Sequence, residues 1–142
     1  MKWDKEKFLK EMRKNTSREV AKTGEMLCDF SEKDADEVSW GRGEEYGTMT
    51  YKSKSDFGLI SLFQITSKGQ IKFCLNVLRQ KDVPKNIMRD FVIKLEANFL
   101  RDYDNVNYPI DSLEDMGELF TTGAQIDKMM QCIEGIAYRL RQ

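Results

Sequence analysis

Histidine is absent from the 142 residues of the chain. Its absence removes the side chain that most often acts as a general base near neutral pH, and it removes the commonest zinc ligand. Neither a Ser-His-Asp nor a Cys-His catalytic group can be assembled from the residues that remain. Many hydrolase mechanisms are thereby excluded. We find no other complete set of catalytic residues, so we expect a protein that is not an enzyme.

Cysteine is scarce, and the three that occur, Cys28, Cys74 and Cys132, lie far apart with no C-x-x-C pair. A structural zinc site needs four ligands, usually Cys and His, so one chain cannot build a standard one. In a chain without a signal peptide, this pattern predicts buried, reduced thiols. We expect no bound metal and no other cofactor.

Long apolar runs are also missing. No stretch approaches the roughly 20 residues that a membrane span requires. The first twelve residues, MKWDKEKFLKEM, are charged throughout and lack the apolar centre of a signal peptide. The sequence therefore predicts a cytoplasmic protein without a membrane partner.

Neither sign of charge is in excess, because 23 basic and 24 acidic residues leave a net charge of −1. Proteins that bind duplex DNA usually have a clear basic excess, since neutralising phosphates supplies much of their affinity. The balance argues against nucleic acid as the main partner, although it permits a local basic patch. A small molecule or another protein is the expected partner.

The apolar residues that are present predict a single α+β domain over residues 1–142. Helical spacing in the first 30 residues includes Thr16 and Glu19 at the spacing of a capping box. A polar loop follows at 31–37. Between Val38 and Leu78 the period changes to two, which predicts about four antiparallel strands in a meander.

Two of these strands are clear enough to assign their faces. In 59–65 we expect one face to hold Leu59, Ser61, Phe63 and Ile65, with apolar residues on the other face as well. The segment 70–78 alternates in the same way and is predicted to be a strand that buries Phe73. Thr66–Gly69 is the predicted turn between the two strands.

Helical spacing returns after Leu78. Asp82 and Pro84 suit a helix start, and a second capping box, Thr122 with Gln125, precedes the last predicted helix. The apolar stripe predicted to face the core in the first of these helices is Ile87, Met88, Phe91, Val92, Leu95 and Phe99.

Several short motifs occur in a fixed order from about Leu27 to Leu140. They are Trp40-Gly41 with Gly43, Gly47-Thr48-Met49, a turn at Gly69, Phe91 with Leu95, and Pro109 with Leu113. In this order the chain resembles a family of uncharacterised prokaryotic proteins and C-terminal domains with a WGxG element, a GS-aromatic element and a Pro-led segment before the last helix. Met49 replaces the aromatic residue. The resemblance implies an architecture and no activity.

The segment SWGRGEEYGTMTYK (39–52) is the first candidate site. One interpretation is a hairpin that Trp40 anchors in the core, with glycines that adopt positive φ angles. The other interpretation is a ligand-binding loop, in which Trp40 and Tyr46 are stacking surfaces and Arg42 contacts an anion or a base. The sequence leaves both open.

A second candidate is a degenerate metal-dependent nuclease. Asp56 precedes Gln70 and Lys72, and the period of two places the latter pair on one face of a strand. Such sites normally hold magnesium with two carboxylates, whereas Gln is a weaker, neutral ligand. A third interpretation is a nucleic-acid accessory protein that uses Arg42 together with Lys52, Lys54, Lys68 and Lys72.

Overall fold

The computed structural model describes residues 2–106 and 108–142. Within them the predicted α+β class is confirmed, because one antiparallel sheet has helices before and after it. Across the sheet the strands follow chain order: β1 (Glu37–Trp40), β2 (Thr48–Ser55), β3 (Gly58–Thr66), β4 (Gln70–Phe73) and β5 (Glu114–Asp115). The helices are α1 (Lys5–Asn15), α2 (Arg18–Asp34), α3 (Leu75–Gln80), α4 (Lys85–Phe99), α5 (Met116–Leu119) and α6 (Gly123–Leu140).

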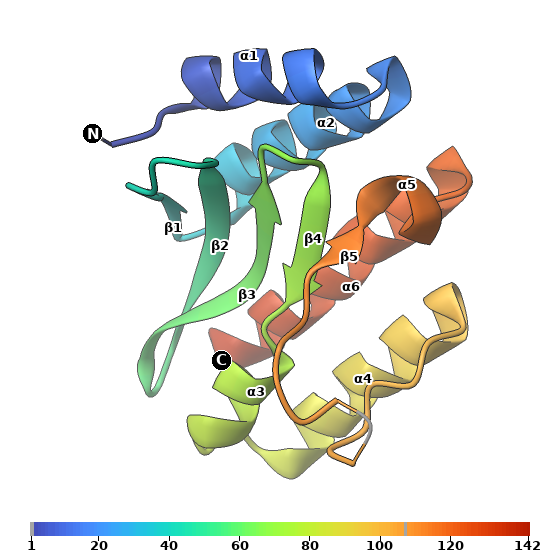
Figure 1. Cartoon of the computed structure of the whole chain (residues 1–142). Helices are drawn as coiled ribbons and strands as arrows, with labels where there is room; N and C mark the ends of the chain where they lie inside the picture. Colours follow the sequence, from blue (N-terminus) through green and yellow to red (C-terminus); the bar gives the residue numbers. More distant parts are fainter. Residues whose placement is uncertain (1, 107) are drawn as a thin grey trace.

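The helices gather on one face of the sheet (Figure 1). Helix α6 crosses behind the strands in this view, α1 and α2 lie at the top, and α3 and α4 lie at the bottom. The helix-covered face is apolar, and the near face is polar, with half-buried Lys52, Gln64 and Lys72. The fully buried side chains of the covered face include Met49, Tyr51, Phe63, Ile65, Ile71 and Phe73.

Strand β3 departs from the predicted alternation at a β-bulge. Tyr51 pairs with Phe63, but the next residue, Lys52, pairs with Ser61, so Leu62 is the additional residue. The bulge allows Leu62 and Phe63, which are neighbours in sequence, both to be buried. The prediction that Ser61 shares a face with Phe63 is therefore wrong, since Ser61 lies on the polar face beside Lys52.

Strand β4 is shorter than predicted. The N–H of Cys74 donates to the carbonyl of Leu62 at 2.9 Å, and helix α3 begins at the next residue. Leu75 and Leu78 are buried three positions apart, which is the spacing of a helix. The prediction of a strand over 70–78 is thus wrong after Phe73, because the alternation of Leu75 with its neighbours concealed a helical period.

The two predicted capping boxes have different outcomes. The Thr122–Gln125 box at the start of α6 is confirmed. Helix α2 instead begins with Ser17, whose hydroxyl accepts from the N–H of Val20 at 3.2 Å. Thr16 donates its hydroxyl to the carbonyl of Met12 at 2.6 Å and ends α1, so its predicted role is wrong.

Candidate functional site

The segment 39–52 folds around Trp3, a residue that the sequence patterns do not single out. Trp3 is only 7% exposed. Its backbone N–H donates to the carbonyl of Gly41 at 2.9 Å, and its indole Nε1–H donates to the carbonyl of Gly43 at 2.7 Å. The only feature of the sequence that could have pointed to Trp3 is that an aromatic residue occurs within a charged N-terminal stretch. The N-terminal segment thus fixes the shape of the glycine-rich loop.

The glycines of this loop provide space and not unusual backbone angles. Among the described glycines, positive φ angles occur at Gly58 and Gly69, so the prediction of positive φ in the loop is wrong. A Cβ on Gly47 would lie 2.5 Å from the Trp3 ring, and a Cβ on Gly41 would lie 2.2 Å from Oγ1 of Thr48. Glycine is therefore required where the loop approaches its neighbours closely.

The three candidate ligand contacts point to different neighbours. Trp40 ends β1, is partly buried and meets the ring of Phe8 edge-on, with ring centroids 5.5 Å apart. Tyr46 is half-buried, and the ammonium of Lys68 lies 5.1 Å from its ring centroid. Arg42 is exposed and lines a small pocket of about 250 Å³ together with Trp3, Lys7, Gly43 and Glu44.

These positions give the loop residues separate expected roles. Trp40→Ala should lower the free energy of unfolding by about 1–3 kcal/mol, because it removes a partly buried ring from the core. Arg42→Ala should change it by less than about 0.5 kcal/mol, since Arg42 is exposed. Urea unfolding of both variants measures the difference. Equal losses of unfolding free energy for the two variants would contradict the assignment of Trp40 to the core and of Arg42 to the surface.

The nuclease-like residues are not brought together. Asp56 lies in the turn before β3, whereas Gln70 begins β4 beyond the far end of β3. A strand of nine residues separates these ends by on the order of 25–30 Å. Within the described ranges there is also no group of three or more Cys, Asp or Glu residues that could hold a metal ion. Lys72 lies opposite Gln64 on the polar face.

The lysines of the nucleic-acid interpretation are spread along the sheet. Lys52 on β2 and Lys72 on β4 share the polar face with β3 between them. Lys52 is 3.7 Å from the carboxylate of Glu37, and Lys68 lies over Tyr46 in the turn between β3 and β4. Lys52 and Lys68 therefore already interact with a carboxylate and an aromatic ring of the same chain.

The cysteines are unsuited to nucleophilic chemistry. All three are buried free thiols, as predicted. Burial raises the pKa of the Cys28 and Cys74 thiols to about 12, and it also raises the pKa of Cys132. Thiols with raised pKa values stay protonated near neutral pH, and the thiolate is the reactive form.

A groove with a volume of about 650 Å³ lies between α3, α4 and residues 104–105. Helix α4 also has apolar side chains outside the face that packs against the core. Met88 and Val92 of the predicted stripe pack against the core but are only partly buried, and Ile93, which lies outside that stripe, is 54% exposed. The apolar side chains that line the groove are Leu78, Val83, Met88, Val92 and Ile93.

The connection after α4 forms the far wall of the groove, and several contacts attach it to the domain. Tyr103 and Tyr108 are buried and meet edge to face, with ring centroids 5.2 Å apart. Arg79 donates to the carbonyls of both tyrosines. The carboxylate of Glu96 accepts from the backbone N–H of Tyr103 at 3.0 Å. These contacts fasten the connection to the domain.

The rim of the groove is charged. Lys85 and Arg89 are exposed and lie one turn apart on α4. Across the described ranges, neither side chain forms a hydrogen bond or an ion pair. On the opposite wall the Asp104 carboxylate accepts from the backbone N–H of Val106 at 2.9 Å, and Glu96 of α4 accepts from the backbone N–H of Tyr103. Asp82 is the remaining carboxylate of the lining.

The chain matches no model of a known protein family, and no curated protein or solved structure matches it significantly. The resemblance carried by the motifs between about Leu27 and Leu140 therefore stays a prediction. None of the helices formed by residues 2–106 and 108–142 has the length and apolar character needed to cross a membrane.

Proposed function

We propose that this protein is a non-enzymatic binding module that holds a segment of a partner protein in the groove between α3 and α4. One observation carries the proposal: the groove has an apolar floor whose side chains Met88, Val92 and Ile93 are covered only in part by the protein's own core. Its volume of about 650 Å³ lies in the range of about 300–1,000 Å³ that is typical of ligand sites.

The apolar floor favours a partner segment with aliphatic or aromatic side chains. Burying one such side chain contributes about 1.5–3 kcal/mol. Ile93 has more than half of its surface available for such a contact, and Met88 adds a flexible side chain that adapts to different shapes. A segment with two or three apolar residues on one side suits this floor.

The charges of the rim favour acidic residues beside the apolar ones. Within residues 2–106 and 108–142, Lys85 and Arg89 form no hydrogen bond or ion pair, whereas two of the three carboxylates of the lining accept hydrogen bonds from backbone N–H groups. Complementary charges at a rim increase the association rate and suppress binding of wrong partners. The proposed occupant is therefore an apolar segment flanked by Asp or Glu.

Selection of short peptides from a random display library against the purified protein tests this proposal. We expect the selected peptides to combine apolar and acidic residues. Ile93→Asp should weaken their binding at least about tenfold, which corresponds to about 1.4 kcal/mol, because it places a charge on the apolar floor. Lys85→Glu combined with Arg89→Glu should weaken it as well. Fluorescence anisotropy measures both effects.

Tyr138→Asp is the matched control, because Tyr138 is an exposed apolar residue on another helix, α6. This variant should bind the selected peptides as the unchanged protein does. Ile93 and Tyr138 are both exposed, so neither change is expected to unfold the domain. Selected peptides that bind the Ile93→Asp protein with unchanged affinity would rule out the groove as the binding site.

A further inference from the structure

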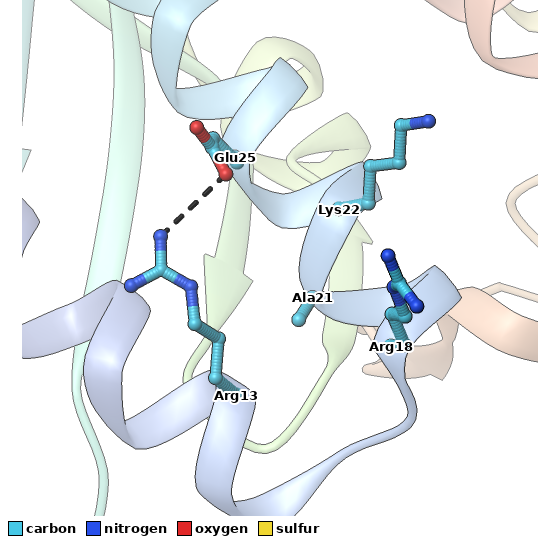
Figure 2. Close-up of a pocket in the computed structure, with 5 residues that line it drawn as sticks. All are labelled: Arg13, Arg18, Ala21, Lys22 and Glu25. Carbon is cyan, nitrogen blue, oxygen red and sulfur yellow. Dashed lines mark ion pairs between the residues drawn. The ribbon is translucent and has the colours of Figure 1, made fainter.

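A second hollow lies between α1 and α2, at the end of the molecule opposite α3 and α4 (Figure 1). It has a volume of about 570 Å³. Arg13 of α1 forms one side, and Arg18 and Lys22 of α2 lie on the other side, as Figure 2 shows. Ala21 forms part of the wall, and its short side chain leaves the space between the cations open. We call this hollow the α1–α2 notch.

The notch concentrates positive charge in a chain whose charges are otherwise balanced. Three of its five lining residues are cations, and Glu25 is its single carboxylate. Arg18 and Lys22 form no side-chain hydrogen bond or ion pair within the described part of the chain. Arg13 lies 3.5 Å from Glu25, with both side chains more than half exposed. Such an exposed pair contributes little to stability and is easily exchanged for another anion.

We infer that the α1–α2 notch binds a small compound that carries two or more phosphate groups. Three cations from two helices lie around one hollow (Figure 2), and their like charges repel one another unless an anion lies near them. Arginine presents a planar set of donors that matches phosphate oxygens in pairs, and lysine adds a mobile point charge. A compound with a single carboxylate would leave most of these donors without an acceptor.

The residues that line the notch also indicate which chemical groups the ligand can carry besides its phosphates. None of the five lining residues is aromatic, so the notch offers no ring on which a nucleobase could stack. The expected recognition is therefore of the phosphate groups themselves. Inorganic pyrophosphate is the simplest probe with this chemistry.

Isothermal titration with pyrophosphate at low salt tests the inference. We expect one saturable site per chain whose affinity falls as salt is raised. Replacing Arg18 and Lys22 together by Gln should weaken binding at least tenfold. Replacing Glu25 by Gln should strengthen binding several-fold, because it removes the only carboxylate of the notch and releases Arg13. This increase distinguishes the notch from a general attraction of anions to the protein.

Lys128→Gln is the matched control, because Lys128 is an exposed lysine on α6, outside the notch. It should leave pyrophosphate binding unchanged. Absence of saturable binding, or equal weakening by Lys128→Gln and by the Arg18/Lys22 double variant, would overturn the inference. So would tighter binding of a single-stranded oligonucleotide, or of vesicles with anionic headgroups, that the double variant abolishes, since the notch would then serve a macromolecular surface.

Discussion

Replacing Phe73 by Ala is expected to lower the free energy of unfolding by about 3–5 kcal/mol. Phe73 is fully buried at the end of β4. Its ring stacks on Phe99 with centroids 6.0 Å apart and meets Tyr103 edge-on at 5.9 Å. The side chain thereby joins the sheet to α4 and to the connection that forms the far wall of the groove. Removing it leaves a cavity where these three parts meet.

Urea unfolding of the Phe73→Ala and Phe73→Leu proteins measures this effect. Phe73→Leu keeps most of the buried volume and should cost about 1–1.5 kcal/mol, because only the ring contacts are lost. A loss below about 1 kcal/mol for Phe73→Ala would mean that the side chain is exposed in solution, and the described core would then be wrong.

The sequence predicted the sheet well where alternation of apolar and polar residues was sufficient. Strands β2 and β3 and the turn at Gly69 belong to this class, since each face of a strand leaves a period of two in the sequence. The bulge at Leu62 could not be predicted in this way, because it depends on how β3 pairs with β2 and not on β3 alone. Strand β5 has only two residues, both acidic, and no apolar pattern marks it.

The end of β4 illustrates a true ambiguity. Residues 75–78, with the sequence LNVL, suit a strand because Leu75 and Val77 are two apart. They also suit a helix because Leu75 and Leu78 are three apart. A stretch this short contains too few residues for either period to exclude the other. The structure forms α3 here, and the shift from strand to helix creates one wall of the groove.

The candidate sites were less predictable than the fold. The apolar excess on α4 is visible in the sequence, because Met88, Val92 and Ile93 extend the stripe beyond the face that the core needs. The opposite wall cannot be predicted from the sequence, because the place of Asp104 beside the groove depends on the contacts of Arg79 and Glu96 with Tyr103, and Arg79 is distant from Tyr103 in sequence. The α1–α2 notch likewise depends on the angle between two helices.

Trp3 presents the same difficulty, because its hydrogen bonds are with residues about 40 positions away in the chain. Trp3→Ala is expected to lower the free energy of unfolding by about 3 kcal/mol, since it removes a buried ring and its indole hydrogen bond. Trp3→Phe should lose less, because much of the ring packing remains. Chemical unfolding followed by circular dichroism measures both changes without relying on tryptophan fluorescence.

The contact between Trp3 and Gly47 allows a sharper test of how this loop is built. Gly47→Ala should cost about 1–3 kcal/mol in the unchanged protein, because the new Cβ would lie 2.5 Å from the Trp3 ring. In the Trp3→Ala protein the same substitution should cost much less, since the ring is gone. The double-mutant cycle should therefore give a coupling free energy of about 1 kcal/mol or more. Additive effects of the two substitutions would mean that Trp3 does not pack against Gly47, and the loop would then depend on the two hydrogen bonds of Trp3 alone.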